Sequence, residues 1–116
     1  MQNKKISVIV CVFNQERWIK NCLDSLIYHQ SISNKDFEII LVDDNSKDQT
    51  QKVIKKYKKF KNIIFIKNRK NLGLPKSLNK AIKKSNNQFI VRVDGDDYVK
   101  KNFLKLSKQF LLKNRK

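Results

Sequence analysis

Four short runs of apolar residues recur along the chain, and each is followed by a segment with a different periodicity. The runs cover residues 6–13, 37–42, 63–66 and 89–93. Their apolar residues are nearly continuous instead of alternating with polar ones, which is typical of parallel strands buried on both faces. The pattern therefore predicts four buried parallel strands.

The segments after these runs have helical periodicity. Asn14 is expected to cap the first helix, residues 46–49 form a capping box before the second, and Pro75 suits the first turn of the third. The inward faces of these three helices are predicted to carry Trp18, Ile19, Cys22, Leu23, Leu26 and Ile27, then Val53, Ile54, Tyr57 and Phe60, then Leu78, Ala81 and Ile82. A last helix is expected to carry Phe103, Leu104, Leu106, Phe110 and Leu111.

Strands thus alternate with helices along the whole chain. This alternation predicts an α/β fold: a Rossmann-like, mostly parallel sheet with helices on both faces and right-handed crossovers. For the strand order we expect 3-2-1-4, as in other Rossmann-like sheets. Residues 1–116 are expected to form one domain.

The net charge of +17 suits a polyanionic partner such as nucleic acid, anionic lipid or a phosphorylated substrate. A Lys- and Asn-rich composition would give the same balance without any such partner. Nucleic acid is disfavoured, because Trp18, Tyr57 and Phe60 fall on helical core spacing and no nucleic-acid motif accompanies the charge.

No apolar run approaches the roughly 20 residues of a spanning helix. We expect a cytoplasmic protein that makes peripheral contact with an anionic membrane.

Two cysteines and one histidine bear on metal and redox chemistry. Cys11 falls in a predicted strand and Cys22 on a predicted helix face, so both are expected to be buried, reduced thiols. A zinc site is excluded by this small set, which contains no C-x-x-C pair and only His29 as a histidine.

Half of the acidic residues follow directly after two of the predicted strands. They are Asp43 and Asp44 after the second strand, and Asp94, Asp96 and Asp97 after the fourth. The carboxyl ends of parallel strands meet at one edge, where open α/β sheets bind their ligands. Each cluster alone also fits a turn. Together they favour a site for Mg²⁺ or Mn²⁺ and a phosphorylated ligand, because hard cations take oxygen ligands and offset carboxylate repulsion.

The phosphates of such a ligand would need a metal and basic side chains. Only Gly73 and Gly95 occur, so no glycine-rich loop can cradle a diphosphate. Arg69, Lys70 and Lys76 are placed to help.

The order of these motifs resembles glycosyltransferase family 2 over nearly the whole chain. The matching segments are 6–14 with Glu16 and 22–26, then 37–46 with Asp48 and Thr50, then 71–73 with 78–79, and finally 94–97, which resembles the family's D-x-D metal motif. The sequence departs from the family at Cys11, where many members have Thr, and at Leu78, where many have Arg.

The resemblance implies a GT-A fold and transfer of a sugar from a nucleotide diphosphate sugar to a glycan or lipid-linked acceptor, as in polysaccharide biosynthesis. Inversion at the anomeric carbon and dependence on Mn²⁺ or Mg²⁺ are also implied. By this resemblance Phe13 lies beside the base, Glu16 and Asp44 lie at the nucleoside, and residues 94–97 lie at the ribose, diphosphate and metal. The expected substrate-binding residues are Cys11, Phe13, Asn14, Glu16, Asp44, Asn71, Gly73, Lys76, Asp94 and Gly95, and the expected metal ligands are Asp94, Asp96 and Asp97.

In the family, the catalytic base and the acceptor-binding half follow the D-x-D motif by many residues, whereas this sequence ends about one helix after it. We therefore expect a C-terminally truncated domain that supplies the donor-binding half, contains no catalytic base, and has little activity alone. Two alternatives remain open: a non-catalytic nucleotide-sugar or metal-binding fragment, and, with less support, a basic nucleic-acid-binding domain. A phosphotransferase of the haloacid dehalogenase-like class is disfavoured, because that class has its D-x-D after the first strand.

Overall fold

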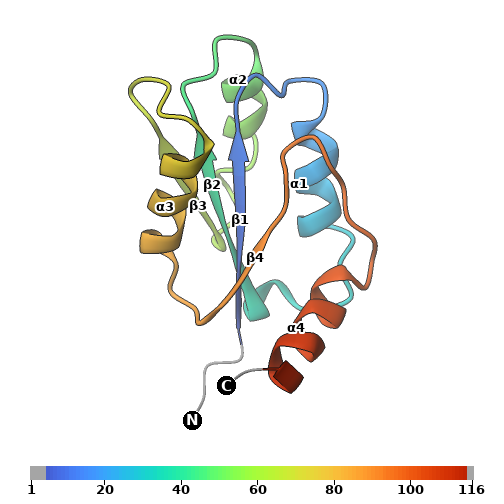
Figure 1. The fold of residues 1–116 in the computed structure, drawn as a ribbon. Coiled ribbons are helices and arrows are strands. Elements are labelled where there is room, and N and C mark those ends of the chain that lie inside the picture. The colour runs from blue at the N-terminus through green and yellow to red at the C-terminus, as the bar shows by residue number, and fades with distance from the viewer. Residues whose placement is uncertain (1–4, 115–116) are drawn as a thin grey trace.

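Four strands form one parallel sheet in the computed structural model, which describes residues 5–114 (Figure 1). They are β1 (Ile6–Val12), β2 (Phe37–Asp43), β3 (Ile63–Lys67) and β4 (Phe89–Arg92). The strand order is β3-β2-β1-β4, and each neighbouring pair is parallel. The predicted strands, their direction and the expected order are confirmed, and the strand ends differ from the prediction by at most one residue.

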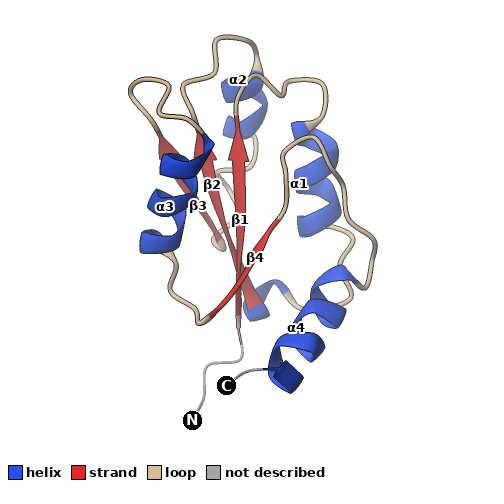
Figure 2. Ribbon diagram, in the orientation of Figure 1, coloured by secondary structure: helices blue, strands red, loops and turns tan. Residues whose placement is uncertain are grey.

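Helices cover both faces of this sheet (Figure 2). They are α1 (Ile19–Ile27), α2 (Thr50–Lys55), α3 (Leu74–Lys84) and α4 (Phe103–Asn114), with the short 3-10 helix η1 (Asn34–Asp36) before β2. The helix α3 packs on one face through Ala81, while α1, α2 and α4 contribute to the core on the other face. This is the predicted α/β layering.

The position of the central strand β1 explains why its segment of the sequence is almost entirely apolar. Successive side chains of a strand point to opposite faces. Val8 and Val10 therefore enter the larger core under α1, α2 and α4, while Ile9 packs with Ala81 on the α3 face. Both faces are covered, so both sets of side chains are mainly apolar.

The helix α2 is shorter than the sequence pattern predicts, and its expected capping box is not formed. Ser46 is not the N-cap; its hydroxyl donates a hydrogen bond to Asp43 Oδ1 and accepts one from Asn14 N–H. The helix begins at Thr50, whose N–H donates to Asp48 Oδ1. The chain after Lys55 continues as turns, and these turns still bury Tyr57 and partly bury Phe60 against the core.

Three further expectations about helices are wrong. Asn14 does not cap α1, because its side-chain oxygen accepts a hydrogen bond from Lys47 N–H in another loop. Trp18 precedes the first residue of α1 and is 48% exposed. Ile82 is also 48% exposed, because α3 turns only its Ser77 and Ala81 side fully toward the sheet.

Within residues 5–114 no helix combines the length and the apolar character that crossing a bilayer requires.

Candidate functional site

A cavity of about 290 Å³ opens at the carboxyl edge of the sheet, where β1, β2 and β4 end. It is lined by Cys11, Val12, Phe13, Gln15, Asp44, Leu74, Ser77, Arg92, Asp94, Gly95 and Asp96. Five of the ten predicted substrate-binding residues line it, namely Cys11, Phe13, Asp44, Asp94 and Gly95, together with Asp96 from the predicted metal ligands. The structure therefore brings these predicted residues together at one edge of the sheet.

Asp44 lies at the end of β2 and is buried at the base of this cavity. Its Oδ1 accepts hydrogen bonds from Asn68 Nδ2 at 2.8 Å and Leu72 N–H at 2.7 Å, and its Oδ2 accepts one from Gly73 N–H at 3.0 Å. Burial by itself would raise the pKa of Asp44, but these hydrogen bonds outweigh burial and hold the pKa below its usual 3.8. The carboxylate is thus ionised at neutral pH, and it orders the loop between β3 and α3.

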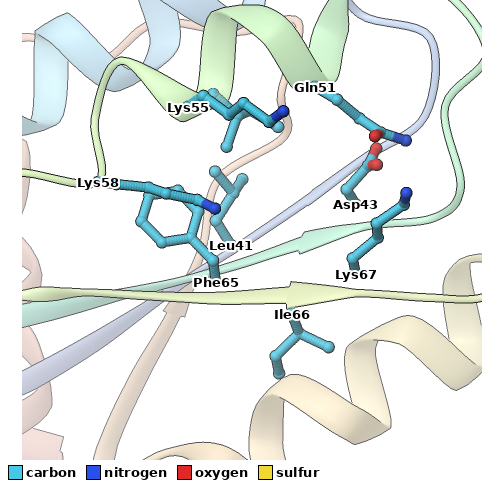
Figure 3. A pocket seen from close by; sticks show the side chains of 9 residues that line it. Leu41, Asp43, Gln51, Lys55, Lys58, Phe65, Ile66 and Lys67 are labelled. Carbon is cyan, nitrogen blue, oxygen red and sulfur yellow. The ribbon is translucent and has the colours of Figure 1, made fainter.

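Asp43 does not belong to the same site, although it is adjacent to Asp44 in the sequence. Its side chain points to the α2 face, where it borders a second cavity of about 200 Å³ with Gln51 and Lys67 (Figure 3). Its Oδ1 accepts from Ser46, and its buried Oδ2 has no hydrogen-bond partner among the described residues. The expectation that both acidic clusters form one site is therefore wrong for Asp43, because alternate strand residues face opposite sides of the sheet.

The turn over residues 94–97 is held against β1 and α1. Asp97 N–H donates to Asp94 O at 3.0 Å, and the Cys22 thiol contacts the same carbonyl oxygen at 3.6 Å. Gly95 is required by the close approach of this turn to β1, since a Cβ at that position would lie 2.4 Å from Val12 Cγ1. The turn thus has a fixed position at the mouth of the cavity.

The carboxylates of Asp94, Asp96 and Asp97 converge on this turn. One oxygen from each lies within 4.8 Å of the others, and all three residues are exposed. Hard divalent cations such as Mg²⁺ and Mn²⁺ prefer such oxygen ligands and retain several waters, which exposed carboxylates allow. The three residues therefore fit a divalent cation, and Asp44 is not part of that group.

Arg92 is a cavity residue that the sequence interpretation missed. Its Nε and Nη2 contact Asp94 Oδ1 at 3.0 Å and 2.9 Å, and both side chains are about half exposed. Strand alternation places Arg92 and Asp94 on the same side, but only the packing of β4 beside β1 brings Arg92 to the cavity. Ser77, Leu74 and Gln15 were also missed, and nothing in their local pattern marks them as cavity residues.

The other predicted site residues surround the cavity without lining it. Asn14 and Glu16 are exposed in the loop after β1, where Glu16 N–H donates to Asp48 Oδ2. Asn71 Nδ2 donates to the Asp44 carbonyl oxygen, and Gly73 has a positive φ of 90° while its N–H reaches the Asp44 carboxylate. These residues shape the loops around the site.

The expected basic phosphate-binding residues are also outside the cavity lining. Arg69, Lys70 and Lys76 are exposed, and the basic residue that lines the cavity is Arg92. Their contacts with phosphates stay a prediction.

The two cysteines are free thiols with different surroundings. Cys22 is fully buried, as predicted, and burial raises the pKa of its thiol to about 12. Cys11 is only partly buried, because it borders the cavity; burial still raises the pKa of its thiol to about 11. Both thiols are protonated at neutral pH, so neither is an activated nucleophile.

The comparisons with known proteins identify the class. A model of the family Glycosyl transferase family 2 matches residues 7–116, so the chain belongs to that family. It is 41% identical over 97 residues to the poly(ribitol-phosphate) beta-glucosyltransferase of Bacillus spizizenii. The aligned region covers 82% of this chain and 15% of that protein. It is 38% identical over 108 residues to the poly(ribitol-phosphate) beta-N-acetylglucosaminyltransferase TarS of Staphylococcus aureus. Here the aligned region covers 92% of this chain and 19% of that protein.

Solved structures agree with the fold. The crystal structure of S. aureus TarS 1-349 in complex with UDP superposes with a TM-score of 0.85 at 37% identity, over 94% of this chain and 32% of that chain. The mannosyltransferase PcManGT from Pyrobaculum calidifontis, at 23% identity, shares the fold with a TM-score of 0.75 over 81% of this chain and 28% of that chain. The predicted GT-A type of fold is confirmed, and the chain spans less than a third of these proteins.

Proposed function

We propose that this chain binds a nucleotide diphosphate sugar and supplies the donor site of an inverting, metal-dependent glycosyltransferase. One observation carries the proposal: Phe13, Asp44, Asp94 and Asp96 meet around a single cavity at the carboxyl edge of the sheet. A buried ionised carboxylate, an exposed aromatic ring and a carboxylate cluster match the base, ribose and diphosphate portions of such a donor. Membership of glycosyltransferase family 2 supports the same assignment.

We further propose a uridine nucleotide as the donor carrier. TarS, at 37% identity, has been crystallised with UDP and with UDP-GlcNAc. In this chain Phe13 is 43% exposed at the cavity, so its ring can pack against a planar base. Asp44 lines the same cavity, and we assign its carboxylate as the acceptor for a donor of the base.

The chemistry at the diphosphate follows from the carboxylate turn. Asp94, Asp96 and Asp97 would hold Mn²⁺ or Mg²⁺, whose charge supplies electrostatic stabilisation to a departing diphosphate. Gly95 keeps the turn close to β1, so the carboxylates stay at the cavity mouth. The Asp43–Ser46 hydrogen bonds and the contact of Ser46 with Asn14 N–H fix the loops that border the nucleoside portion.

The acceptor is proposed to be a glycan or a lipid-linked acceptor; both relatives are named for a polymer, poly(ribitol-phosphate). Under this proposal every carboxylate that lines the cavity takes part in donor binding, so none of them is left to deprotonate an acceptor. We therefore expect the 116-residue chain to bind donor and to transfer sugar far below an ordinary enzymatic rate of about 1 per second.

Calorimetry with UDP tests the donor site. We expect UDP to bind in the presence of Mn²⁺ and to lose most of that affinity when Mn²⁺ is removed with a chelator. Asp96→Ala should weaken the Mn²⁺-dependent part by about tenfold or more, since it removes a charged ligand. Asp36→Ala, in the distant η1 helix, is the matched control. Unchanged Mn²⁺-dependent binding in Asp96→Ala would show that the carboxylate turn is not the metal site.

A turnover assay with UDP-sugars then addresses catalysis. If this chain alone transfers sugar to an added acceptor at an ordinary rate, the expectation that it contains no catalytic base is wrong. Slow hydrolysis of the donor would not, because water needs no acceptor site.

A further inference from the structure

Arg92 is the basic side chain among the residues that line the proposed donor cavity. It is the last residue of β4 and pairs in register with Ile9 of β1. Both of its contacting nitrogens reach the same carboxylate oxygen, Asp94 Oδ1. The arrangement places a fixed cation directly beside the carboxylate turn.

This position has opposite consequences for a cation and for an anion. Asp94, Asp96 and Asp97 attract a divalent cation, but the guanidinium already offsets part of their charge and repels a second cation. A diphosphate entering the cavity meets Asp44, Asp94 and Asp96, which repel it, and Arg92, which attracts it. The same side chain therefore disfavours the metal alone and favours the metal together with a diphosphate.

We propose that Arg92 is the counter-ion of Asp94 in the nucleotide-free site and a direct ligand of the donor diphosphate once nucleotide binds. The inference rests on the proposed donor-binding function. A guanidinium carries five N–H donors in a planar fork, so it can keep one contact with Asp94 while donating to a phosphate oxygen. Its side chain is 48% exposed, which leaves those donors accessible from the cavity.

The test measures two affinities in the 116-residue chain: Mn²⁺ alone, from the paramagnetic resonance of the free ion, and UDP at saturating Mn²⁺, by calorimetry. Arg92→Gln should bind Mn²⁺ alone about threefold to tenfold more tightly, because a repelling charge is removed. The same variant should bind UDP about tenfold to a hundredfold more weakly, because charge-assisted hydrogen bonds are lost.

Two companion variants separate charge from geometry. Arg92→Lys keeps the charge but lacks the planar fork, so Mn²⁺ binding should stay at the wild-type level while UDP binding weakens by about threefold to tenfold. Lys105→Gln removes one exposed positive charge from α4 and should change neither affinity by more than about twofold, because salt screens distant charges. Thermal unfolding of each variant verifies that it folds.

Opposite changes in the two affinities are the distinctive result. If Arg92→Gln weakens Mn²⁺ binding or leaves it unchanged, the counter-ion role is wrong. If it tightens Mn²⁺ binding without weakening UDP binding, the diphosphate role is wrong. If the wild-type chain does not bind UDP at all, the proposed function fails, while the Mn²⁺ measurement still decides whether Arg92 offsets Asp94.

Discussion

The acidic residues around the cavity have different surroundings, and these surroundings suit them to different functions. Asp44 is buried and accepts hydrogen bonds from three residues of the loop between β3 and α3. Asp94, Asp96 and Asp97 are exposed on a turn, where water and a cation can reach them. A buried carboxylate with several donors orders a loop, whereas a cluster of exposed carboxylates is suited to a hydrated cation.

Asp44→Asn tests the buried carboxylate through the pH dependence of stability. The pKa of Asp44 is held below 3.8 in the folded chain, so its stabilising contribution is present above pH 3.8 and is lost as pH falls through the folded pKa. We expect Asp44→Asn to lower the free energy of unfolding by about 1–3 kcal/mol at neutral pH. Urea denaturation should show the difference from wild type shrinking toward pH 3. A pH-independent difference would contradict this, and Asp36→Asn serves as control.

Gly95→Ala tests the close approach of the carboxylate turn to β1. A Cβ here would lie 2.4 Å from Val12 Cγ1, so the turn must shift. We expect destabilisation of roughly 1–3 kcal/mol, as for other overpacked sites. In a Val12→Ala background the cost should be smaller, because the clashing methyl group is gone. Additive effects of the two substitutions in denaturation experiments would show that this contact does not require glycine.

The site is built by loops that follow strands, and side chains in neighbouring loops connect them. The loop after β1 and the loop after β2 are joined by Asn14 N–H to Ser46 Oγ at 2.9 Å, Lys47 N–H to Asn14 Oδ1 at 2.8 Å, and Gln15 N–H to Thr50 Oγ1 at 2.8 Å. Asn14 and Asn45 both adopt positive φ, which Asn tolerates better than most residues. The two loops therefore behave as one connected unit beside the cavity.

Ser46→Ala should uncouple these loops. The substitution leaves Asn14 N–H without its acceptor and Asp43 without its hydroxyl donor, so we expect a loss of about 1–3 kcal/mol in the free energy of unfolding. Amide hydrogen exchange should accelerate in both loops while the central β1 amides stay protected. Ser31→Ala, at an exposed position, is the control. Faster exchange in only one loop would show that Ser46 does not link them.

At the scale of the whole molecule, β4 and α4 leave an apolar surface at one end of the sheet. The strand β4 is an outer strand, and Ile90, Leu106 and Phe110 are 38%, 61% and 64% exposed around a cavity of about 430 Å³. Exposed apolar patches and open strand edges promote association. The net charge of +17 opposes it through repulsion between copies.

We expect the chain to self-associate at high salt, which screens that repulsion. Phe110→Lys should reduce the association, because it places a charge within the patch, whereas Ile82→Lys, on α3 at the other face of the sheet, should not. Sedimentation velocity at low and high salt measures the effect. Equal association of wild type and Phe110→Lys would show that this patch is not responsible.

The sequence by itself determined the sheet and its edge. The near-continuous apolar character of β1 and β2 follows from burial on both faces, so their strand type and direction could be predicted. Polar residues directly after those strands predicted the edge at which the cavity opens, because all parallel strands end there. These features depend on residues close together in the chain.

The tertiary structure alone decided which of the edge residues share a cavity. Asp43 and Asp44 are neighbours in sequence but face opposite sides of the sheet, and Ser46 contacts Asn14 instead of capping α2. Arg92 and Ser77 reach the cavity because β4 lies beside β1 and α3 packs over β1 and β2. Contacts of this kind join residues far apart in the chain, and local propensity contains no information about which side chains will meet.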